Sequence, residues 1–356
     1  MKILITGPSL DSNHNIGGIS TVIKTIMRHN KEQKYYHYLL GRSDKPVNKL
    51  KWFLKSFRQF AKFPVFVRKH KIELVHQNLP LDPKGIIREL IIQTWCVWLQ
   101  VPVVLHVHGG VFITKGTQNK LYRRIILRLF RRATQVLVLS DLEQKILNEQ
   151  FGCTNSLVLP NSLDVRVYNS IVPKQWNESP RILFLGRIEK NKGIVELVEA
   201  LKNLPTEIDF KFIVCGKGPL LEYCIEKCSI ALGDKFEYRG VVSGKEKIKI
   251  IKESAVFVLP SYFEGLPMAL LETMADGVVP VVTKVGSMKQ IIQHRENGLL
   301  VSKQNAEDLS EKLKDILSDR QLFNKLSVNA KNTVIESFSI EKQIIKLNEI
   351  YKQSNK

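Results

Sequence analysis

The stretch of sequence that decides the fold runs from Ala255 to Thr283, AVFVLPSYFEGLPMALLETMADGVVPVVT. Its first five residues are an apolar run closed by Pro260, a pattern typical of a strand that is buried on both faces, as in a parallel sheet. Apolar residues then recur at helical spacing from Met268, until Gly277 provides a C-terminal stop. A second apolar strand follows at 280–283. The stretch therefore predicts a βαβ unit.

The loop before the helix lies on the ligand side of such a unit. Ligands of open α/β sheets bind beyond the carboxyl ends of the strands, and the free amides of a helix N-terminus favour anions such as phosphates. The loop carries Glu264, and Glu272 follows eight residues later, about 2.2 turns on at roughly 3.6 residues per turn. Two arbitrary glutamates are usually solvated surface charges, so the surrounding sequence must decide their role.

That surrounding sequence, SYFEGLPMALLETMADG at 261–277, resembles the Glu-x7-Glu signature of retaining nucleotide-sugar glycosyltransferases, specifically glycosyltransferase family 4. The resemblance spans essentially the whole chain. It implies an α/β fold of two Rossmann-like domains facing across a cleft, the architecture called GT-B, with the donor held mainly by the second domain. It also implies that Glu272 hydrogen-bonds the nucleotide ribose and that Glu264 binds hydroxyls of the donor sugar. The acceptor in this family attacks from the face that the leaving group vacates, so Glu264 is not a nucleophile.

A pair of cations, Arg187 and Lys192, brackets a loop between a strand expected at 181–185 and a helix expected at 194–201. A diphosphate in this loop would meet both charges and the helix amides. On an arbitrary loop such a pair is usually solvated, but here it is similar to the diphosphate clamp of the family. The resemblance adds two further donor-binding segments, which are Arg239-Gly240-Val241 near the nucleotide base and Gly265-Leu266-Pro267 beside Glu264.

The first half of the chain contributes a glycine loop and a histidine. A strand at 2–6 leads into a loop that ends in Gly17-Gly18, and glycines let backbone amides approach an anion. The spacing is not Gly-x-Gly-x-x-Gly, which argues against a nicotinamide dehydrogenase; the resemblance matches these glycines to the loop that faces the donor diphosphate. After a strand at 101–106, the His-Gly pair looks like the active-site histidine of the family, which favours His108 over His106 for positioning the sugar. Histidines in such loops are more often structural, and the sequence leaves open which of the two lines the site.

The length of 356 residues is enough for two domains. We expect an acceptor-side domain at 1–165, a linker at 166–180, where periodicity is lost, and a nucleotide-sugar-binding domain at 181–339. The resemblance further implies that a helix at about 340–356 crosses back to cover the first domain.

The net charge of +20 is unevenly distributed, because residues 1–170 contain 26 Lys or Arg against 10 Asp or Glu, and the remainder contains 28 against 24. A one-sided basic surface favours polyanions, either nucleic acid or an anionic membrane leaflet. Between Arg42 and Lys71, basic residues alternate with aromatic ones such as Trp52 and Phe57, and Lys120–Arg132 is a second basic amphipathic helix. This mixture suits a membrane interface. The alternatives are a surface helix whose aromatics pack inward and a nucleic-acid interface, which we do not expect.

No apolar run reaches the ~20 residues that cross a bilayer, and the N-terminus leads into a strand and not into a signal peptide. We therefore expect a cytoplasmic protein, peripheral on the inner face of the plasma membrane. The five cysteines lack Cys-x-x-Cys spacing and are expected to be reduced and structural. The sequence has no Asp-x-Asp triplet, the usual device for a metal-bound diphosphate, so no metal cofactor is expected; cations and helix dipoles would stabilise the leaving group.

Together these features predict a retaining hexosyltransferase. It would move a sugar from a nucleotide-diphosphate donor, a UDP-sugar by family frequency with GDP second, to a lipid-linked or saccharide acceptor in exopolysaccharide, capsule or lipopolysaccharide assembly. One alternative is a nucleotide-sugar epimerase or hydrolase of the same fold. Another is a non-catalytic protein that binds anionic lipid or nucleic acid, but the intact set of Arg187, Lys192, Glu264 and Glu272 argues against it. The sequence does not name the donor sugar, the acceptor, the linkage or the oligomeric state.

Overall fold

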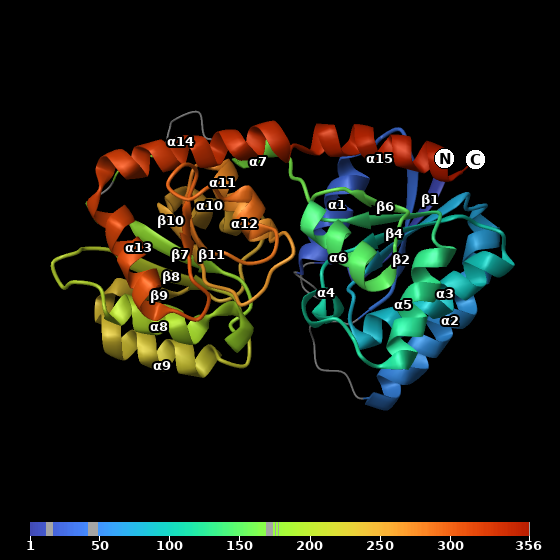
Figure 1. Cartoon of the computed structure of the whole chain (residues 1–356), viewed down its shortest axis with the longest axis horizontal. Helices are drawn as coiled ribbons and strands as arrows, with labels where there is room; N and C mark the ends of the chain where they lie inside the picture. The colour runs from blue at the N-terminus through green and yellow to red at the C-terminus, as the bar shows by residue number, and fades with distance from the viewer. Residues whose placement is uncertain (12–16, 42–48, 169–173, 175, 177, 356) are drawn as a thin grey trace. The chain divides into compact units, whose positions relative to one another are not determined.

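The structure, a computed structural model, describes residues 1–11, 17–41, 49–168, 174, 176 and 178–355, with the backbone alone for 49–56 and 114–115. The chain divides into two compact units. Unit 1 comprises Met1–Ser162 together with Ile340–Lys356, and unit 2 comprises Leu163–Ser339. Each unit is built on a six-stranded parallel sheet flanked by helices (Figure 1). The prediction of two Rossmann-like α/β domains is therefore confirmed.

The sheet of unit 1 has the spatial order β2-β1-β3-β4-β5-β6. Its strands are β1 (Lys2–Gly7), β2 (Lys34–Leu39), β3 (Leu74–Leu79), β4 (Val103–Val107), β5 (Gln135–Val138) and β6 (Ser156–Val158). The apolar strands β1, β3 and β4 lie at the centre, where both faces are covered. Strand β2, with the sequence KYYHYL, forms one edge and is only partly buried. Its polar residues hide the apolar signal, which explains why the sequence did not predict this strand.

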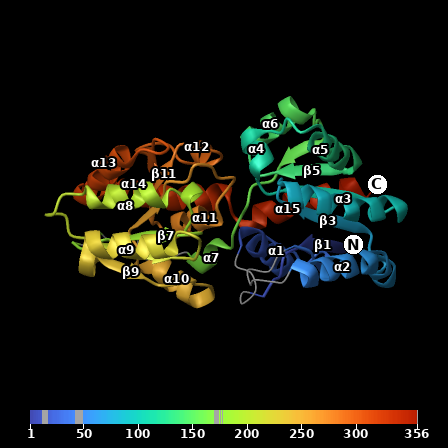
Figure 2. The same cartoon turned by 90° about the horizontal axis from the view of Figure 1, so that it is seen from below.

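The helices of unit 1 are α1 (Gly18–His29), α2 (Lys49–His70), α3 (Pro83–Trp98), α4 (Val111–Lys115), α5 (Lys120–Arg132), α6 (Asp141–Phe151) and α15 (Ile340–Ser354). Figures 1 and 2 show α1 and α15 on one face of the sheet and α2, α3 and α5 on the other. This division follows from right-handed crossovers, because the chain steps one way from β1 to β2 and the opposite way afterwards. Helix α3 begins at Pro83, because Asp82 caps it by accepting from the amides of Lys84 and Gly85.

Helix α2 occupies most of the basic and aromatic segment that the sequence places between 42 and 71. Residues 42–48 lie outside the described residues, and no side chain is described for Trp52. Phe63 and Val67 are buried in the core of unit 1, whereas Phe57 and Val65 are 63% and 65% exposed. The helix therefore both packs aromatics inward and presents apolar side chains to solvent. Within the described residues, every helix is too short or too polar to span a membrane.

The sheet of unit 2 has the order β12-β11-β10-β7-β8-β9. Its strands are β7 (Arg181–Leu185), β8 (Lys211–Cys215), β9 (Phe236–Tyr238), β10 (Val256–Leu259), β11 (Val279–Thr283) and β12 (Leu299–Val301). Its helices are α7 (Val165–Tyr168), α8 (Ile194–Lys202), α9 (Leu221–Leu232), α10 (Gly244–Glu253), α11 (Met268–Ala275), α12 (Met288–Ile291), α13 (Ala306–Ser318) and α14 (Arg320–Ser337), with 3-10 turns η1 (Lys190–Lys192) and η2 (Gly233–Lys235). Strands β10 and β11 pair in parallel, which confirms the predicted βαβ unit around α11.

The segment 166–180, expected to be an interdomain linker, is instead part of unit 2. Its first residues belong to α7, Tyr168 is buried, and the ammonium of Lys174 lies 2.8 Å from Asp276 Oδ2. The boundary falls after Ser162. Loss of periodicity identifies an irregular segment, but tertiary contacts decide whether it is packed. Residues 169–173, 175 and 177 lie outside the described residues.

The last helix, α15, covers two buried histidines of unit 1. The Tyr351 hydroxyl lies 2.6 Å from His76 Nδ1, and His76 Nε2 lies 3.3 Å from His106 Nδ1. The Tyr351 hydroxyl and the two imidazole rings therefore form one hydrogen-bonded row. Burial lowers the pKa of His106 to about 3 and the pKa of His76 well below its ordinary value. Both rings are therefore neutral in the folded protein.

These buried histidines predict that unit 1 loses stability in acid. An unfolded histidine binds a proton below its ordinary pKa of about 6.5, whereas buried His106 remains neutral down to about 3. Stability should fall as the pH drops from about 6.5, by up to roughly 1.4 kcal/mol per pH unit for each histidine. The substitution His106→Gln should remove one such contribution and flatten the slope between pH 6.5 and 4.5.

Urea unfolding followed by tryptophan fluorescence measures this slope. Three of the four tryptophans lie in unit 1, so a Trp176→Phe background restricts the signal to that unit. Glu143 changes stability in the opposite direction, because burial raises its pKa to about 7 and its folded form gains stability as the pH falls. This contribution should be equal in both proteins. Above pH 7.5 the two proteins should therefore show parallel pH dependence. Equal slopes for both proteins below pH 6.5 would contradict the assignment of His106 as a buried neutral ring.

Candidate functional site

Glu264 lies in the loop after β10, where its carboxylate is held from two sides. The ammonium of Lys192, from η1, lies 2.6 Å from Glu264 Oε1, and Ser261 Oγ donates to the same oxygen at 2.7 Å. The side chains of Lys192 and Glu264 are 21% and 11% exposed, so the pair is largely buried but reaches solvent. The fold thus joins two residues that are 72 positions apart. A carboxylate held in this way is suited to accept hydrogen bonds from a ligand.

Two glycines allow the neighbouring loops to pack closely against the Glu264 loop. A Cβ at Gly286 would lie 1.8 Å from the carbonyl oxygen of Glu264, and a Cβ at Gly193 would lie 2.1 Å from that of Pro260. Both glycines also have positive φ angles, +52° and +73°. Only glycine permits this approach and this backbone conformation. The loops after β7, β10 and β11 are therefore in backbone contact at the carboxyl edge of the sheet.

Glu272, in α11, is paired as closely as Glu264. Its side chain is 4% exposed, and Glu272 Oε1 lies 2.6 Å from the ammonium of Lys247 in α10. Tyr168 of α7 donates a further hydrogen bond to the carboxylate. Burial, followed by the charge of Glu272, raises the pKa of Tyr168 far above its ordinary value, so its hydroxyl stays protonated and remains a donor.

The other predicted donor residues of unit 2 lie on loops along the same edge of the sheet. Arg187 is exposed directly after β7, and Gly265-Leu266-Pro267 lead into α11, with Pro267 as its N-cap. The Gly240 carbonyl accepts from the Gly216 amide at 2.7 Å, which ties the loop after β9 to the loop after β8. Arg239 pairs with Glu237 at 2.6 Å on the surface, and Val241 is 41% exposed.

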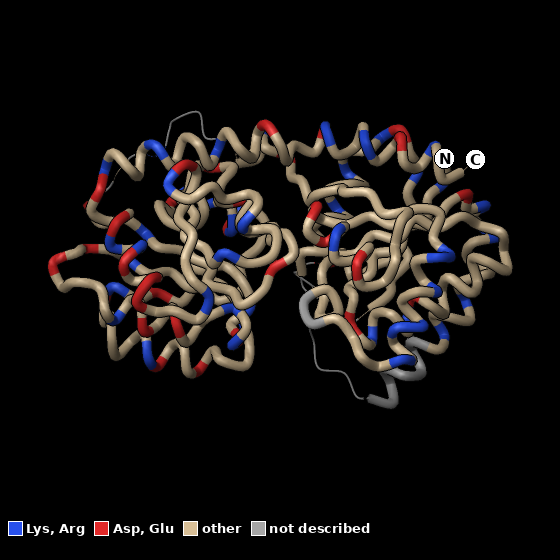
Figure 3. Tube along the Cα trace, in the orientation of Figure 1, with Lys and Arg blue, Asp and Glu red and all other residues tan. Residues whose placement is uncertain are grey.

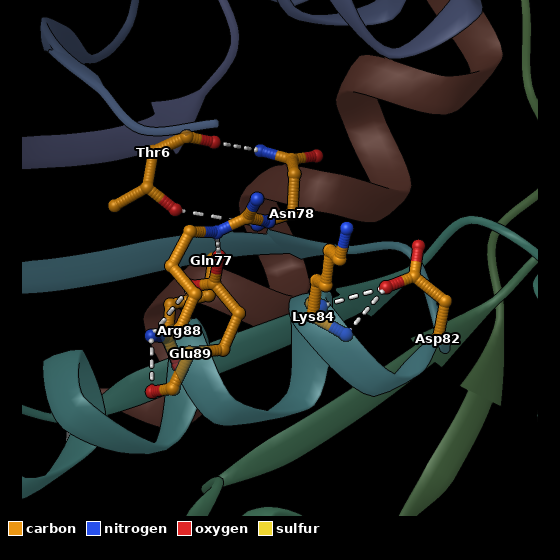
Figure 4. Close-up of polar contacts among 8 residues, drawn as sticks. Thr6, Gln77, Asn78, Asp82, Lys84, Arg88 and Glu89 are labelled. Atoms are coloured by element: carbon orange, nitrogen blue, oxygen red, sulfur yellow. Dashed lines mark hydrogen bonds and ion pairs between the residues drawn. The ribbon is translucent and has the colours of Figure 1, made fainter. Parts of the chain in front are cut away.

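In unit 1, His108 follows β4 and is oriented by an amide. His108 Nε2 lies 2.7 Å from Asn78 Oδ1, while Asn78 Nδ2 donates to the Thr6 carbonyl at 2.8 Å (Figure 4). The second contact fixes the amide with its oxygen toward the histidine. A carboxamide oxygen can only accept, so the proton of His108 is on Nε2 and the lone pair is on Nδ1. Burial, reinforced by His106 and His76, lowers the pKa of His108 well below its ordinary value. His108 is therefore a neutral acceptor.

The two candidate histidines differ in accessibility. His106 is fully buried and bonded to His76, and its ring centroid is 4.1 Å from that of His108. His108 is only partly buried. His108 therefore keeps some contact with solvent, whereas His106 has none.

The glycine loop of unit 1 is described only at its end. Gly17 is the N-cap of α1 and has an extended backbone, and both Gly17 and Gly18 are exposed. Residues 12–16 lie outside the described residues.

A second polar cluster in Figure 4 lies on the opposite face of β3. Gln77 Nε2 donates to Glu89 Oε2 at 2.9 Å, and Arg88 Nε donates to Glu89 Oε1 at 2.7 Å. Because neighbouring strand residues face opposite sides, Gln77 points away from the side of Asn78. Burial raises the pKa of Glu89, an effect that Arg88 opposes. This cluster fastens α3 to the sheet and is separate from the histidines.

Among the residues that the structure describes, no group of three or more His, Cys, Asp or Glu side chains is placed to hold a metal ion. The five cysteines are free and buried.

Several residues of these clusters escaped the sequence analysis. Lys247 is one of four lysines in α10 and has no distinguishing spacing. Tyr168 stands in the segment expected to be a linker, and Ser261 and Gly286 are polar or small residues in loops. Their positions give no periodic signal, so only the folded chain reveals their contacts.

Comparison with known proteins places the whole chain in one functional class. The family model described as Glycosyltransferase Family 4 matches residues 16–167, and the one described as Glycosyl transferases group 1 matches residues 170–333. The chain is 31% identical over 164 residues to an uncharacterized glycosyltransferase of Methanocaldococcus jannaschii, covering 46% of this chain and 42% of that protein. It is 24% identical over 326 residues to the Escherichia coli UDP-Gal:alpha-D-GlcNAc-diphosphoundecaprenol alpha-1,3-galactosyltransferase, covering 84% of this chain and 80% of that protein.

Solved structures share the fold. The sucrose-phosphate synthase of Thermosynechococcus elongatus superposes with a TM-score of 0.80 at 17% identity, covering 99% of this chain and 98% of that chain. Anabaena HepE, in complex with UDP and glucose, superposes with a TM-score of 0.78 at 15% identity and 99% coverage of both chains. The family models match successive parts of the chain on two Rossmann-like units, and we conclude that the protein is a glycosyltransferase that belongs to glycosyltransferase family 4.

Proposed function

We propose that the protein is a retaining glycosyltransferase that uses a nucleotide-diphosphate sugar, a UDP-sugar in the first instance, and a lipid-linked or saccharide acceptor in cell-surface polysaccharide assembly. The observation that carries the donor part is the pair of lysine-held carboxylates in unit 2. Lys192 holds Glu264 and Lys247 holds Glu272, each at 2.6 Å. Glu264 would accept hydrogen bonds from hydroxyls of the sugar, and Glu272 would accept them from hydroxyls of the ribose.

The leaving diphosphate needs stabilisation of its developing charge. Arg187, Lys192 and the free amides at the start of α11 lie on loops at the carboxyl edge of the unit 2 sheet. Fixed cations and helix amides aimed at such charge lower the barrier to departure. We therefore propose that these groups carry the leaving-group charge without a required metal cofactor.

In the transfer, the acceptor oxygen forms a bond to the anomeric carbon on the face from which the nucleoside diphosphate departs. The electron pair of the broken carbon–oxygen bond leaves with the diphosphate, which also takes the hydroxyl proton. Glu264 would bind the sugar and would not attack it, since Oε1 is already engaged by Lys192 and Ser261. His108, with its lone pair on Nδ1, would accept a hydrogen bond from a sugar hydroxyl.

The surface of unit 1 supports an acceptor held on a membrane. Helix α2 contains seven Lys or Arg and α5 contains six, and neither contains an acidic residue. The only carboxylate of α3, Glu89, is buried against Arg88. Figure 3 shows basic positions outnumbering acidic ones along these helices.

Apolar side chains lie among these charges. Trp98 is 59% exposed, and the Arg68 guanidinium lies 4.6 Å from its ring centroid. Arg132 of α5 contacts Thr94 of α3, which joins the third helix to this surface. We call this surface, which includes Phe57, Arg58, Lys62, Val65, Arg68, Trp98, Arg124 and Arg128, the α2–α3–α5 face. Cationic heads around exposed apolar groups suit an anionic lipid interface, and the Escherichia coli relative is named for a diphosphoundecaprenol acceptor.

Nucleotide binding tests the donor site. In a thermal-shift panel of nucleotides and nucleotide sugars, UDP or GDP should raise the melting temperature of the wild type by several degrees at saturation, because a ligand at about 100 Kd adds roughly 2.7 kcal/mol. Arg187→Ala and Glu272→Ala should remove the shift, since each eliminates a proposed donor contact.

Arg295→Ala serves as the matched control, because Arg295 is an exposed arginine of unit 2 paired with Asp315; it should keep the full shift. A panel in which no nucleotide stabilises the wild type would overturn the donor site. With a binding sugar nucleotide identified, free sugar formed without acceptor would indicate a hydrolase, and interconversion of the donor would indicate an epimerase.

Vesicle binding tests the α2–α3–α5 face. The protein should co-sediment with phosphatidylglycerol vesicles at low salt and not with phosphatidylcholine vesicles. The double substitution Arg124→Glu/Arg128→Glu should weaken this binding by at least about tenfold, since each basic residue near an anionic surface contributes about 1 kcal/mol.

The matched control is Lys245→Glu/Lys249→Glu, which makes the same change in net charge at exposed positions of α10. It should leave vesicle binding nearly unchanged. If both double variants lose binding equally, the attraction is a property of net charge and not of the α2–α3–α5 face.

A further inference from the structure

Lys247 occupies an unusual position among the lysines of α10. Lys245, Lys249 and Lys252 are exposed, whereas the Lys247 side chain keeps only 20% of its surface exposed and its ammonium lies 2.6 Å from Glu272 Oε1. An exposed lysine would keep its rotamer freedom and its hydration. The inward position of Lys247 therefore has a cost that its contact with Glu272 must offset.

A neighbouring pair shows a lysine whose role is complete within the fold. The ammonium of Lys174 donates to Asp276 Oδ2 at 2.8 Å, to the Ile251 carbonyl at 3.1 Å and to the Lys252 carbonyl. Its three N–H donors therefore have three acceptors. Within the part of the chain that the structure describes, Lys247 has one acceptor, Glu272. Lys247 can thus donate further hydrogen bonds, whereas all three donors of Lys174 already have acceptors.

Glu272 can also accept further hydrogen bonds. A carboxylate has about four positions at which it can accept hydrogen bonds. Lys247 and Tyr168 occupy two of them, from two different helices. Counting the partners among the described residues, two acceptor positions remain, which is the number that the two adjacent hydroxyls of a ribose would fill.

We propose that Lys247 and Tyr168 are positioning residues that fix the Glu272 carboxylate to receive the vicinal diol of the donor ribose. This inference rests on the proposed function, in which Glu272 binds that ribose. A carboxylate held by two protein donors loses little freedom when the diol arrives, so more of the binding energy is retained. The charge of Lys247 also offsets that of Glu272, which would otherwise repel the donor diphosphate.

Stability alone would not separate this role from a purely structural one, because a buried ion pair can often be replaced by apolar side chains without loss. The preference for ribose hydroxyls is a better readout. The dissociation constants of UDP, 2′-deoxy-UDP and 3′-deoxy-UDP would be measured by calorimetry for the wild type, Lys247→Met, Tyr168→Phe and Lys249→Met. If the panel identifies GDP as the ligand, the guanosine analogues replace these compounds.

The wild type should prefer UDP over each deoxy analogue by about tenfold or more, because a hydrogen bond to a charged group is lost in each case. Lys247→Met should reduce this preference to about twofold, and Tyr168→Phe should reduce it to an intermediate value. Lys249→Met, which removes a 76%-exposed lysine from the same helix, should keep the wild-type preference.

The outcomes separate this inference from the proposed function. If Lys247→Met and Tyr168→Phe keep the full preference while Glu272→Gln loses it, the positioning role is overturned and the donor site stands. If the wild type binds no nucleoside diphosphate, both fall together. If it binds UDP and its deoxy analogues equally, the ribose contact of Glu272 and this inference fall, while the nucleotide site stands. Should Lys247→Met fail to fold by circular dichroism, Lys247→Arg takes its place. Its different donor geometry should lower the preference, and full preference in both Lys247→Arg and Tyr168→Phe would overturn the inference.

Discussion

In unit 2, the arrangement of the loops depends on pairing each buried carboxylate with a cation. Glu264 and Glu272 are largely withdrawn from water, where an unpaired charge would be costly. Lys192 reaches the first carboxylate from the loop after β7, and Lys247 reaches the second from α10. Satisfying these two charges therefore fixes the positions of η1, α10 and α11 relative to one another. The residues that would bind a donor are thus the same residues that hold the loops in place.

Backbone packing makes this arrangement possible. The loops at the carboxyl edge of the unit 2 sheet approach so closely that a Cβ at Gly193 or Gly286 would collide with a carbonyl oxygen. Glycine at these positions lets the lysine and the glutamate meet across neighbouring loops. The charged site and the glycine contacts therefore depend on each other, and neither is readily changed alone.

Unit 1 buries its polar side chains in a different way. Its sheet carries His76 and His106 beneath α15, where burial keeps both rings neutral and hydrogen bonds link them to each other and to the Tyr351 hydroxyl. At the edge of this buried row, Asn78 sets the tautomer of His108. The orientation of the accessible histidine is therefore decided by Asn78 on β3 and Thr6 on β1. The opposite face of the same sheet carries α2, α3 and α5, whose outer surfaces are basic and partly apolar.

The sequence determined much of this protein by itself. Continuous apolar runs are long enough to specify buried parallel strands, and the apolar spacing between Met268 and Ala275 specifies α11, so the βαβ unit was predictable. The two α/β units followed from the resemblance of this stretch to a known family. The positions of Glu264, Glu272, Arg187 and Lys192 followed from a motif of fixed spacing. Tertiary structure alone decided the partners of these residues, because Lys247 and Tyr168 reach Glu272 from distant segments without any periodic pattern. It also decided that residues 166–168 pack in unit 2 and that His106 is buried behind His108, since burial depends on contacts between elements and not on local sequence.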